Sequence, residues 1–126
     1  MDIFISYSSK EYAQASKIRD ALVSNGLSVW MAPDSITSGF DYTSAIPGAI
    51  SECSILLLVL SNASQASKWV LAEVENAFKK DKIIIPVSIE ECKLNEVFDF
   101  LLSRAQHIAL YNNWNAAIPT LIDHIN

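Results

Sequence analysis

Glycine is scarce in this sequence, and its few glycines are far apart. Gly26, Gly39 and Gly48 are the only three among 126 residues. They cannot form a GxGxxG fingerprint or a Walker loop, so a glycine-rich cradle for nucleotide phosphates is excluded. A GxSxG nucleophile elbow is also missing. The chain therefore lacks the common glycine-dependent motifs for catalysis or nucleotide binding.

Residues that commonly bind metals or form disulfides are also few. The two histidines, His107 and His124, are remote from each other and from Cys53 and Cys92. This spacing matches no metal site, and the two cysteines form no CxxC pattern. Because the chain shows no secretion signal, we expect both thiols to be reduced and buried or half-buried.

Clusters of positive charge and long apolar runs are absent as well. The net charge is −5, and the sequence contains no cluster of Lys and Arg residues. Neither nucleic acid nor an anionic membrane surface is therefore expected as a partner. The longest apolar run, residues 55–60, is too short to cross a bilayer, and the first residues lack the basic region of a signal peptide. We expect a cytoplasmic protein.

Hydrophobic residues, by contrast, are plentiful. They make up 51% of the chain, and a chain of this length can bury roughly two thirds of its unfolded surface in one core. We expect a single domain over residues 1–126.

Apolar strand patterns alternate with helical patterns along the chain. Strands are expected at residues 3–5, 27–31, 55–60, 83–87 and 107–110. Helices are expected at 41–52, 68–80, 97–102 and 114–125, and an earlier one begins at a capping box over 8–11 and ends at 25–26. This alternation predicts a doubly wound α/β fold with a parallel sheet.

Three local features refine this prediction. Residues 55–60 are apolar without alternation, which is typical of a central strand covered on both faces. Pro86 indicates that its strand lies toward an edge or lacks one ladder hydrogen bond. Pro47 predicts a kinked or late-starting helix.

In doubly wound sheets, ligands bind beyond the carboxyl ends of the strands. The loops that begin at Ser6, Ala32 and Ser61 are therefore expected to line the cleft. A phosphate-receiver domain would need an acidic residue where Ser61 and Asn62 follow the central strand. A flavodoxin would need a glycine in the loop after the first strand, and residues 6–9 contain none. Both interpretations are weakened.

The helix expected at 68–80 carries the best candidate for chemistry. Its buried stripe is expected to be Val70, Val74, Ala77 and Phe78. Trp69 and Glu73 lie four residues apart on one flank, about 100° from that stripe, whereas Glu75 falls on the opposite flank. Periodicity alone allows two interpretations of Trp69 and Glu73: a local packing aromatic with an exposed acid favoured by the helix dipole, or a site facing the cleft.

Several segments together resemble the Toll/interleukin-1 receptor (TIR) domain family. They are residues 2–8 (DIFISYS), 30–39 (WMAPDSITSG), 56–61 and 67–73 (SKWVLAE). The resemblance covers essentially the whole chain in order, and the Trp-Met-Ala-Pro run is most similar to prokaryotic members.

The resemblance implies a flavodoxin-like three-layer sandwich with a five-stranded parallel sheet in the order 2-1-3-4-5. It also implies that Glu73 is the catalytic residue and that Trp69 contacts the substrate in members that cleave NAD+. The family pattern extends the substrate contacts to Tyr7 and Ser8 after the first strand. It adds Ser35, Ile36 and Phe40 from the loop of residues 34–40, which is expected to gate the cleft and dock on other TIR domains.

The implied chemistry is compatible with one carboxylate. Nicotinamide in NAD+ is already cationic and leaves as a neutral amine, so no general acid is needed, unlike in two-carboxylate glycosidases. A carboxylate near the ribose would stabilise the oxocarbenium-like transition state, and an indole ring could stack on a flat base.

The expected function is that of an NAD+ glycohydrolase or cyclase. It would release nicotinamide and form ADP-ribose or a cyclic product, in prokaryotic antiviral signalling activated by self-assembly. NAD+ would be substrate, with no resident cofactor and no metal, and a fused or separate sensor or effector could act with the domain. The alternative is a scaffold that only associates with other TIR domains through residues 34–40. An FMN or nucleotide carrier is a weaker third alternative.

Overall fold

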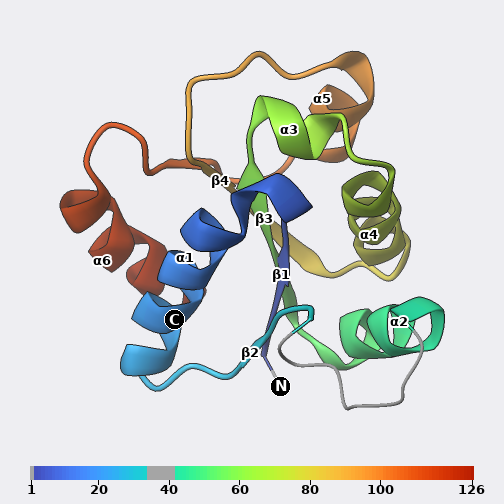
Figure 1. Cartoon of the computed structure of the whole chain (residues 1–126), viewed down its shortest axis with the longest axis horizontal. Helices are drawn as coiled ribbons and strands as arrows, with labels where there is room; N and C mark the ends of the chain where they lie inside the picture. Colours follow the sequence, from blue (N-terminus) through green and yellow to red (C-terminus); the bar gives the residue numbers. More distant parts are fainter. Residues whose placement is uncertain (1, 34–41) are drawn as a thin grey trace.

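A computed structural model describes residues 2–33 and 42–126 and shows a five-stranded parallel sheet in the order β2-β1-β3-β4-β5 (Figure 1). The strands are β1 (Ile3–Ser6), β2 (Val29–Trp30), β3 (Ile55–Leu60), β4 (Ile83–Ser88) and β5 (Ile108–Ala109). All four neighbouring pairs are parallel. The predicted fold class and strand order are therefore confirmed.

The helices cover both faces of this sheet. They are η1 (Ser9–Glu11, a 3₁₀ turn), α1 (Tyr12–Ser24), α2 (Tyr42–Glu52), α3 (Asn62–Gln65), α4 (Lys68–Lys79), α5 (Glu96–Leu101) and α6 (Trp114–Ile125). Figure 1 shows α1 and α6 on one side and α2, α4 and α5 on the other. No helix in the described ranges is both long and apolar enough to cross a membrane.

Alternation along β1 assigns its side chains to two separate cores. Ile3 and Ile5 pack in the core under α1 and α6, whereas Phe4 packs in the core under α2, α4 and α5. Because successive strand residues point to opposite faces, Ser6 shares the face of Phe4 and points toward the α4 layer. β3 contributes to both cores, and all six of its residues are buried. Its predicted central position is confirmed.

Of the two alternatives predicted from Pro86, the edge position is wrong and the point without a ladder hydrogen bond is the one observed. β4 lies between β3 and β5. Ile83 and Ile89 donate their backbone N–H groups toward the β3 side, so the nitrogen of Pro86, three residues from each, faces the β5 side. Pairing with β5 begins only at Val87. The missing N–H of Pro86 therefore costs no ladder bond, because β5 has not yet begun.

The start of α1 also differs from the sequence prediction. The Ser8 side chain accepts from the backbone N–H of Lys10 and caps the short turn η1. Glu11 does not complete the predicted capping box, because its carboxylate binds Ser61 on another segment. The predicted helix end is confirmed, since Gly26 adopts a left-handed φ of 80°.

Two other helices correct the prediction. The loop expected after β3 contains α3, whose start is a reciprocal capping box between Ser61 and Ser64. In addition, α2 begins at Tyr42 and runs through Pro47, so the late start is wrong and the alternative, a kink at Pro47, stays a prediction.

The buried stripe of α4 is narrower than predicted. Val70, Val74 and Ala77 are buried, but Phe78 is 44% exposed. At about 100° per residue, Ala77 lies only about 20° from Val70 around the helix, whereas Phe78 lies about 80° away. The helix therefore directs Ala77 at the sheet and leaves Phe78 at its side, 6.0 Å from the ring of Phe100.

Candidate active site

The candidate site lies at the carboxyl ends of the central strands. Ser6 is the last residue of β1, and Ser61 directly follows β3. Both side chains are completely buried, at 0% exposure. Each donates its hydroxyl proton to a glutamate from a different segment, so this edge of the sheet holds two serine–glutamate pairs.

The first pair joins β1 to α4. Ser6 Oγ donates to Oε1 of Glu73 at 2.7 Å. α4 starts with a firm cap, because the Ser67 side chain accepts from the backbone N–H of Val70, and its stripe of Val70 and Val74 packs against the sheet. This packing brings Glu73, the residue before Val74, to the end of β1.

One oxygen of the Glu73 carboxylate stays free. Oε2 has no hydrogen-bond partner among the described residues. The one side-chain oxygen or nitrogen there that is both fully buried and without a partner is Oδ1 of Asn76, so Oε2 of Glu73 is not fully buried. Oε2 is therefore accessible to solvent or to a ligand. The carboxylate is half-buried, with one oxygen held by the protein and one open.

Burial changes the protonation of this group. Desolvation raises the pKa of Glu73 from 4.5 to about 7, and the hydrogen bond from Ser6 partly opposes this rise by lowering the pKa. Near neutral pH the side chain is therefore close to an even mixture of carboxylate and carboxylic acid. A titratable group tuned to this range is a frequent property of catalytic sites.

Trp69 lies one turn before Glu73 on α4 and is 62% exposed. It is therefore not a packing residue at the helix start, as one of the two interpretations from periodicity held. Most of its ring surface is available to a ligand. The predicted placement of Trp69 and Glu73 on neighbouring turns of one helix is confirmed.

Tyr7 and Ser8 connect the loops at the same edge of the sheet. The Tyr7 hydroxyl donates to the backbone carbonyl of Ala32, which follows β2, and its ring lies 6.1 Å from that of Tyr12. Ser8 is buried and caps η1. Both residues hold the loop after β1 in place, and a direct contact with substrate stays a prediction. The predicted site residues Ser35, Ile36 and Phe40 lie outside the described residues.

The second pair, Ser61 with Glu11, was not predicted. Ser61 Oγ donates to Glu11 Oε1 at 2.5 Å and accepts from the backbone N–H of Ser64 at 3.0 Å. Glu11 is only 8% exposed. Sequence reasoning also missed Ser6 as a partner of Glu73. The available signal was a serine directly at the end of the apolar strands β1 and β3, where a hydroxyl is buried and needs a partner.

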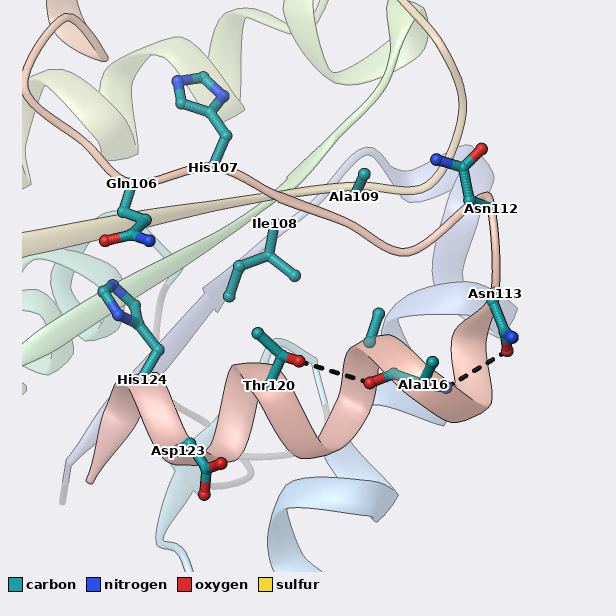
Figure 2. Close-up of a pocket in the computed structure, with 11 residues that line it drawn as sticks. Gln106, His107, Ile108, Ala109, Asn112, Asn113, Ala116, Thr120, Asp123 and His124 are labelled. Atoms are coloured by element: carbon teal, nitrogen blue, oxygen red, sulfur yellow. Dashed lines mark hydrogen bonds between the residues drawn. The ribbon is translucent and has the colours of Figure 1, made fainter.

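Two sizeable concavities lie away from Glu73. One, of about 610 Å³, lies between β5 and α6 and includes His107, Asp123 and His124 among its lining residues (Figure 2). The other, of about 790 Å³, is bordered by Phe78 and Phe100. Neither is lined by Glu73, Ser6 or Trp69. The side chains of His107, Asp123 and His124 are exposed. We place the candidate site at Glu73 because a buried hydroxyl holds its carboxylate there.

No group of three or more histidine, cysteine, aspartate or glutamate side chains is placed to hold a metal ion within residues 2–33 and 42–126. Glu73 is joined to an uncharged serine. The arrangement can therefore stabilise a developing positive charge or exchange a proton through Glu73 itself.

Comparison with known proteins identifies this architecture. The model of the TIR domain family matches residues 3–122. The structure is similar to the TIR domain of the Toll-related receptor TRR-2 from Hydra magnipapillata, with a TM-score of 0.83, 15% identity and coverage of 98% of this chain and 97% of that one. No curated protein sequence matches the chain.

Two further solved structures are similar over nearly their whole length. The TIR domains of the activated Roq1 resistosome, which recognises the pathogen effector XopQ, give a TM-score of 0.73 at 18% identity, with 98% and 96% coverage. The CMP N-glycosidase BcmB of Clostridium botulinum gives 0.68 at 19%, with 96% and 98% coverage. At such identities the likeness to these structures shows the fold alone.

Proposed function

We propose, from the premise that this chain belongs to the TIR domain family, that it cleaves the bond between nicotinamide and ribose in NAD+. Glu73 is the proposed catalytic residue, and Trp69 is the proposed stacking partner of a flat ring of the substrate. The observation that carries this proposal is the hydrogen bond from buried Ser6 to Glu73, which holds a carboxylate beside an exposed tryptophan.

The proposed reaction breaks the bond between ribose C1 and the nicotinamide nitrogen. The bonding electrons go to the cationic ring, which leaves as neutral nicotinamide, so no acid has to protonate it. Positive charge develops on the ribose, and the free oxygen Oε2 of Glu73 stabilises it. This stabilisation is strong because the carboxylate is partly desolvated. Addition of water then gives ADP-ribose and a proton. Attack by a nucleophile within the same molecule gives a cyclic product.

A neighbouring fold supports the reaction class. BcmB is a CMP N-glycosidase, so a protein of similar architecture acts on a bond between a sugar and a base. CMP has a neutral base that needs a proton on leaving, whereas NAD+ does not. A single carboxylate paired with a serine fits the cationic leaving group better.

The test is NAD+ turnover at high protein concentration by the wild-type domain, Glu73→Gln and Glu75→Gln. Glu75 is the matched control, because it is exposed on the same helix two residues further on. We expect Glu73→Gln to lower nicotinamide release by at least about 100-fold, with little change in Glu75→Gln. Mass spectrometry identifies the product. A wild-type domain that leaves NAD+ intact in every assembly state would overturn the proposal.

We further propose that the domain works in assembled signalling complexes of a prokaryotic, cytoplasmic antiviral system, with a fused or separate sensor or effector. The TIR domains of Roq1, which are part of an assembled resistosome, support the assembly step. The alternative function, a scaffold without turnover, uses the same association through residues 34–40.

Sedimentation of Ile36→Ala and Phe40→Ala against the wild type tests this association. Loss of oligomers in both variants supports a role of the loop. A wild-type domain that stays monomeric at all concentrations contradicts it. Oligomers together with an inactive Glu73 site would favour the scaffold.

A further inference from the structure

The end of β1 places a buried hydroxyl where it can act on only one partner. Ser6 shares a sheet face with Phe4 and so points to the layer that contains α4. Its side chain is 0% exposed, which leaves no water for the hydroxyl group. Its one hydrogen bond in the described structure is the 2.7 Å contact with Glu73 Oε1.

We propose that Ser6 is the positioning residue for Glu73: its hydroxyl fixes Oε1 and leaves Oε2 directed at the sugar, in the ionised form that the reaction uses. This inference rests on the proposed function, because the reaction is the one proposed above. Ser6 does not touch the reacting atoms in this scheme. It acts through the carboxylate that it holds.

The free energy of ionisation supports this role. A hydroxyl donor stabilises the carboxylate form over the acid, which is why the Ser6 bond lowers the pKa of Glu73 against the effect of burial. Without it, the pKa would lie above 7, and less carboxylate would be present at neutral pH. Loss of this hydrogen bond also frees the Glu73 side chain to rotate.

Ser6 has no charged competitor for this role in the described structure. The elements packed most closely against α4 are α2, α3, α5, β1, β3 and β4. Their charged residues are Glu52 on α2, and Glu96 and Asp99 on α5. None of these is among the causes of the Glu73 pKa shift, which are burial and Ser6. A change in that titration on altering Ser6 can therefore be assigned to the lost hydrogen bond.

The chain offers a matched control in the second serine–glutamate pair. Ser61 is also completely buried after a central strand and also donates to a glutamate, Glu11. Ser61→Ala removes the same group from the neighbouring strand end without touching Glu73. Any effect common to both variants reflects strand-end stability, and an effect confined to Ser6→Ala reflects positioning of Glu73.

The experiment compares wild type, Ser6→Ala and Ser61→Ala by two readouts. The first is titration of the Glu73 carboxyl by carbon-13 NMR in glutamate-labelled protein, assigned with Glu73→Gln. The second is the pH profile of NAD+ cleavage. For Ser6→Ala we expect the Glu73 pKa to rise by about one unit, which lowers the ionised fraction at pH 7 about fivefold. We expect kcat to fall at least as much, with recovery of part of the loss at higher pH.

Ser61→Ala is expected to leave both the Glu73 titration and the acid limb of the profile in place. Should Ser6→Ala fail to fold, Ser6→Cys gives the same comparison, because a thiol keeps the shape of the side chain, although it is somewhat larger, and is only a weak donor. Unchanged Glu73 titration in the Ser6 variants, or an equal shift in Ser61→Ala, would overturn the inference. If the wild type cleaves no NAD+, the proposed function fails, and the titration alone decides whether Ser6 controls Glu73.

Discussion

The Ser6–Glu73 pair and the Ser61–Glu11 pair lie at the ends of adjacent strands, and they differ in what surrounds each carboxylate. Ser61 also accepts from the N–H of Ser64 and so ties Glu11 to the start of α3. Ser6 holds Glu73 alone, one turn from the exposed ring of Trp69. The same pair of groups therefore joins two loops in one place, and in the other it holds the carboxylate that we propose to be catalytic.

The difference can be traced to the element that delivers each glutamate. Glu11 ends a short 3₁₀ turn directly before α1, so its position follows from the chain path near Ser8. Glu73 comes from the middle of α4, a helix packed on the sheet by Val70, Val74 and Ala77. A rigid, packed helix is the better support for a group that must keep its geometry during a reaction.

The largest expected difference between the pairs is in the pH dependence of turnover. With the pKa of Glu73 near 7 and the carboxylate as the active form, kcat/KM should fall about 100-fold between pH 8 and pH 5. Glu11→Gln should keep this acid limb, because Glu11 has no role in the proposed reaction. Circular dichroism across the same range checks that the fold persists. A flat wild-type profile, or a limb that moves in Glu11→Gln, would remove the functional distinction between the pairs.

Stability should respond to pH through Glu73 in the opposite direction. The pKa of Glu73 is about 7 in the folded protein and 4.5 when unperturbed, so the folded state binds the proton more tightly. The stabilisation is complete below pH 4.5 and is lost as the pH rises to 7. Above that, the ionised group costs about 3 kcal/mol. Glu73→Gln should therefore raise the free energy of unfolding at pH 8 and leave it nearly unchanged at pH 4.5.

Urea denaturation at the two pH values measures this effect. Gln keeps an oxygen that accepts from Ser6, so the change isolates the charge. Glu75→Gln, altered at an exposed position of the same helix, should stay within about 0.5 kcal/mol of wild type at both pH values. An equal gain for Glu73→Gln at pH 4.5 and pH 8 would contradict the raised pKa.

The sequence predicted the frame of this site well because the frame depends on local pattern. The apolar run of β3 indicated a central strand, and a spacing of four residues placed Trp69 and Glu73 on neighbouring turns of one helix. Ala77 and Phe78 show where such patterns fail: both fit the stripe by spacing, yet only Ala77 is buried. Ala77 lies about 20° from Val70 around the helix, whereas Phe78 lies about 80° from it on the other side.

Contacts between distant segments were beyond the reach of these patterns. Ser6 and Glu73 are separated by 67 positions, and Ser61 and Glu11 by 50. Each pair depends on how segments that are distant in the sequence pack against each other at the end of a strand. Local rules favoured a capping box between Ser8 and Glu11, but the Glu11 carboxylate instead accepts a hydrogen bond from the buried hydroxyl of Ser61. A buried donor without a partner costs about 1–3 kcal/mol, enough to outweigh one local cap.

The smallest expected effect concerns Trp69, the exposed aromatic residue one turn before Glu73 on α4. Trp69 is 62% exposed, so Trp69→Ala should change the free energy of unfolding by no more than about 0.5 kcal/mol. Loss of stacking on a flat ring should raise KM for NAD+ about tenfold, and Trp69→Phe should recover part of it. Phe100→Ala is the control, because Phe100 is a similarly exposed aromatic, at 67%, beside the separate concavity near Phe78. Equal changes of KM in Trp69→Ala and Phe100→Ala would show that the Trp69 ring makes no specific contact with NAD+.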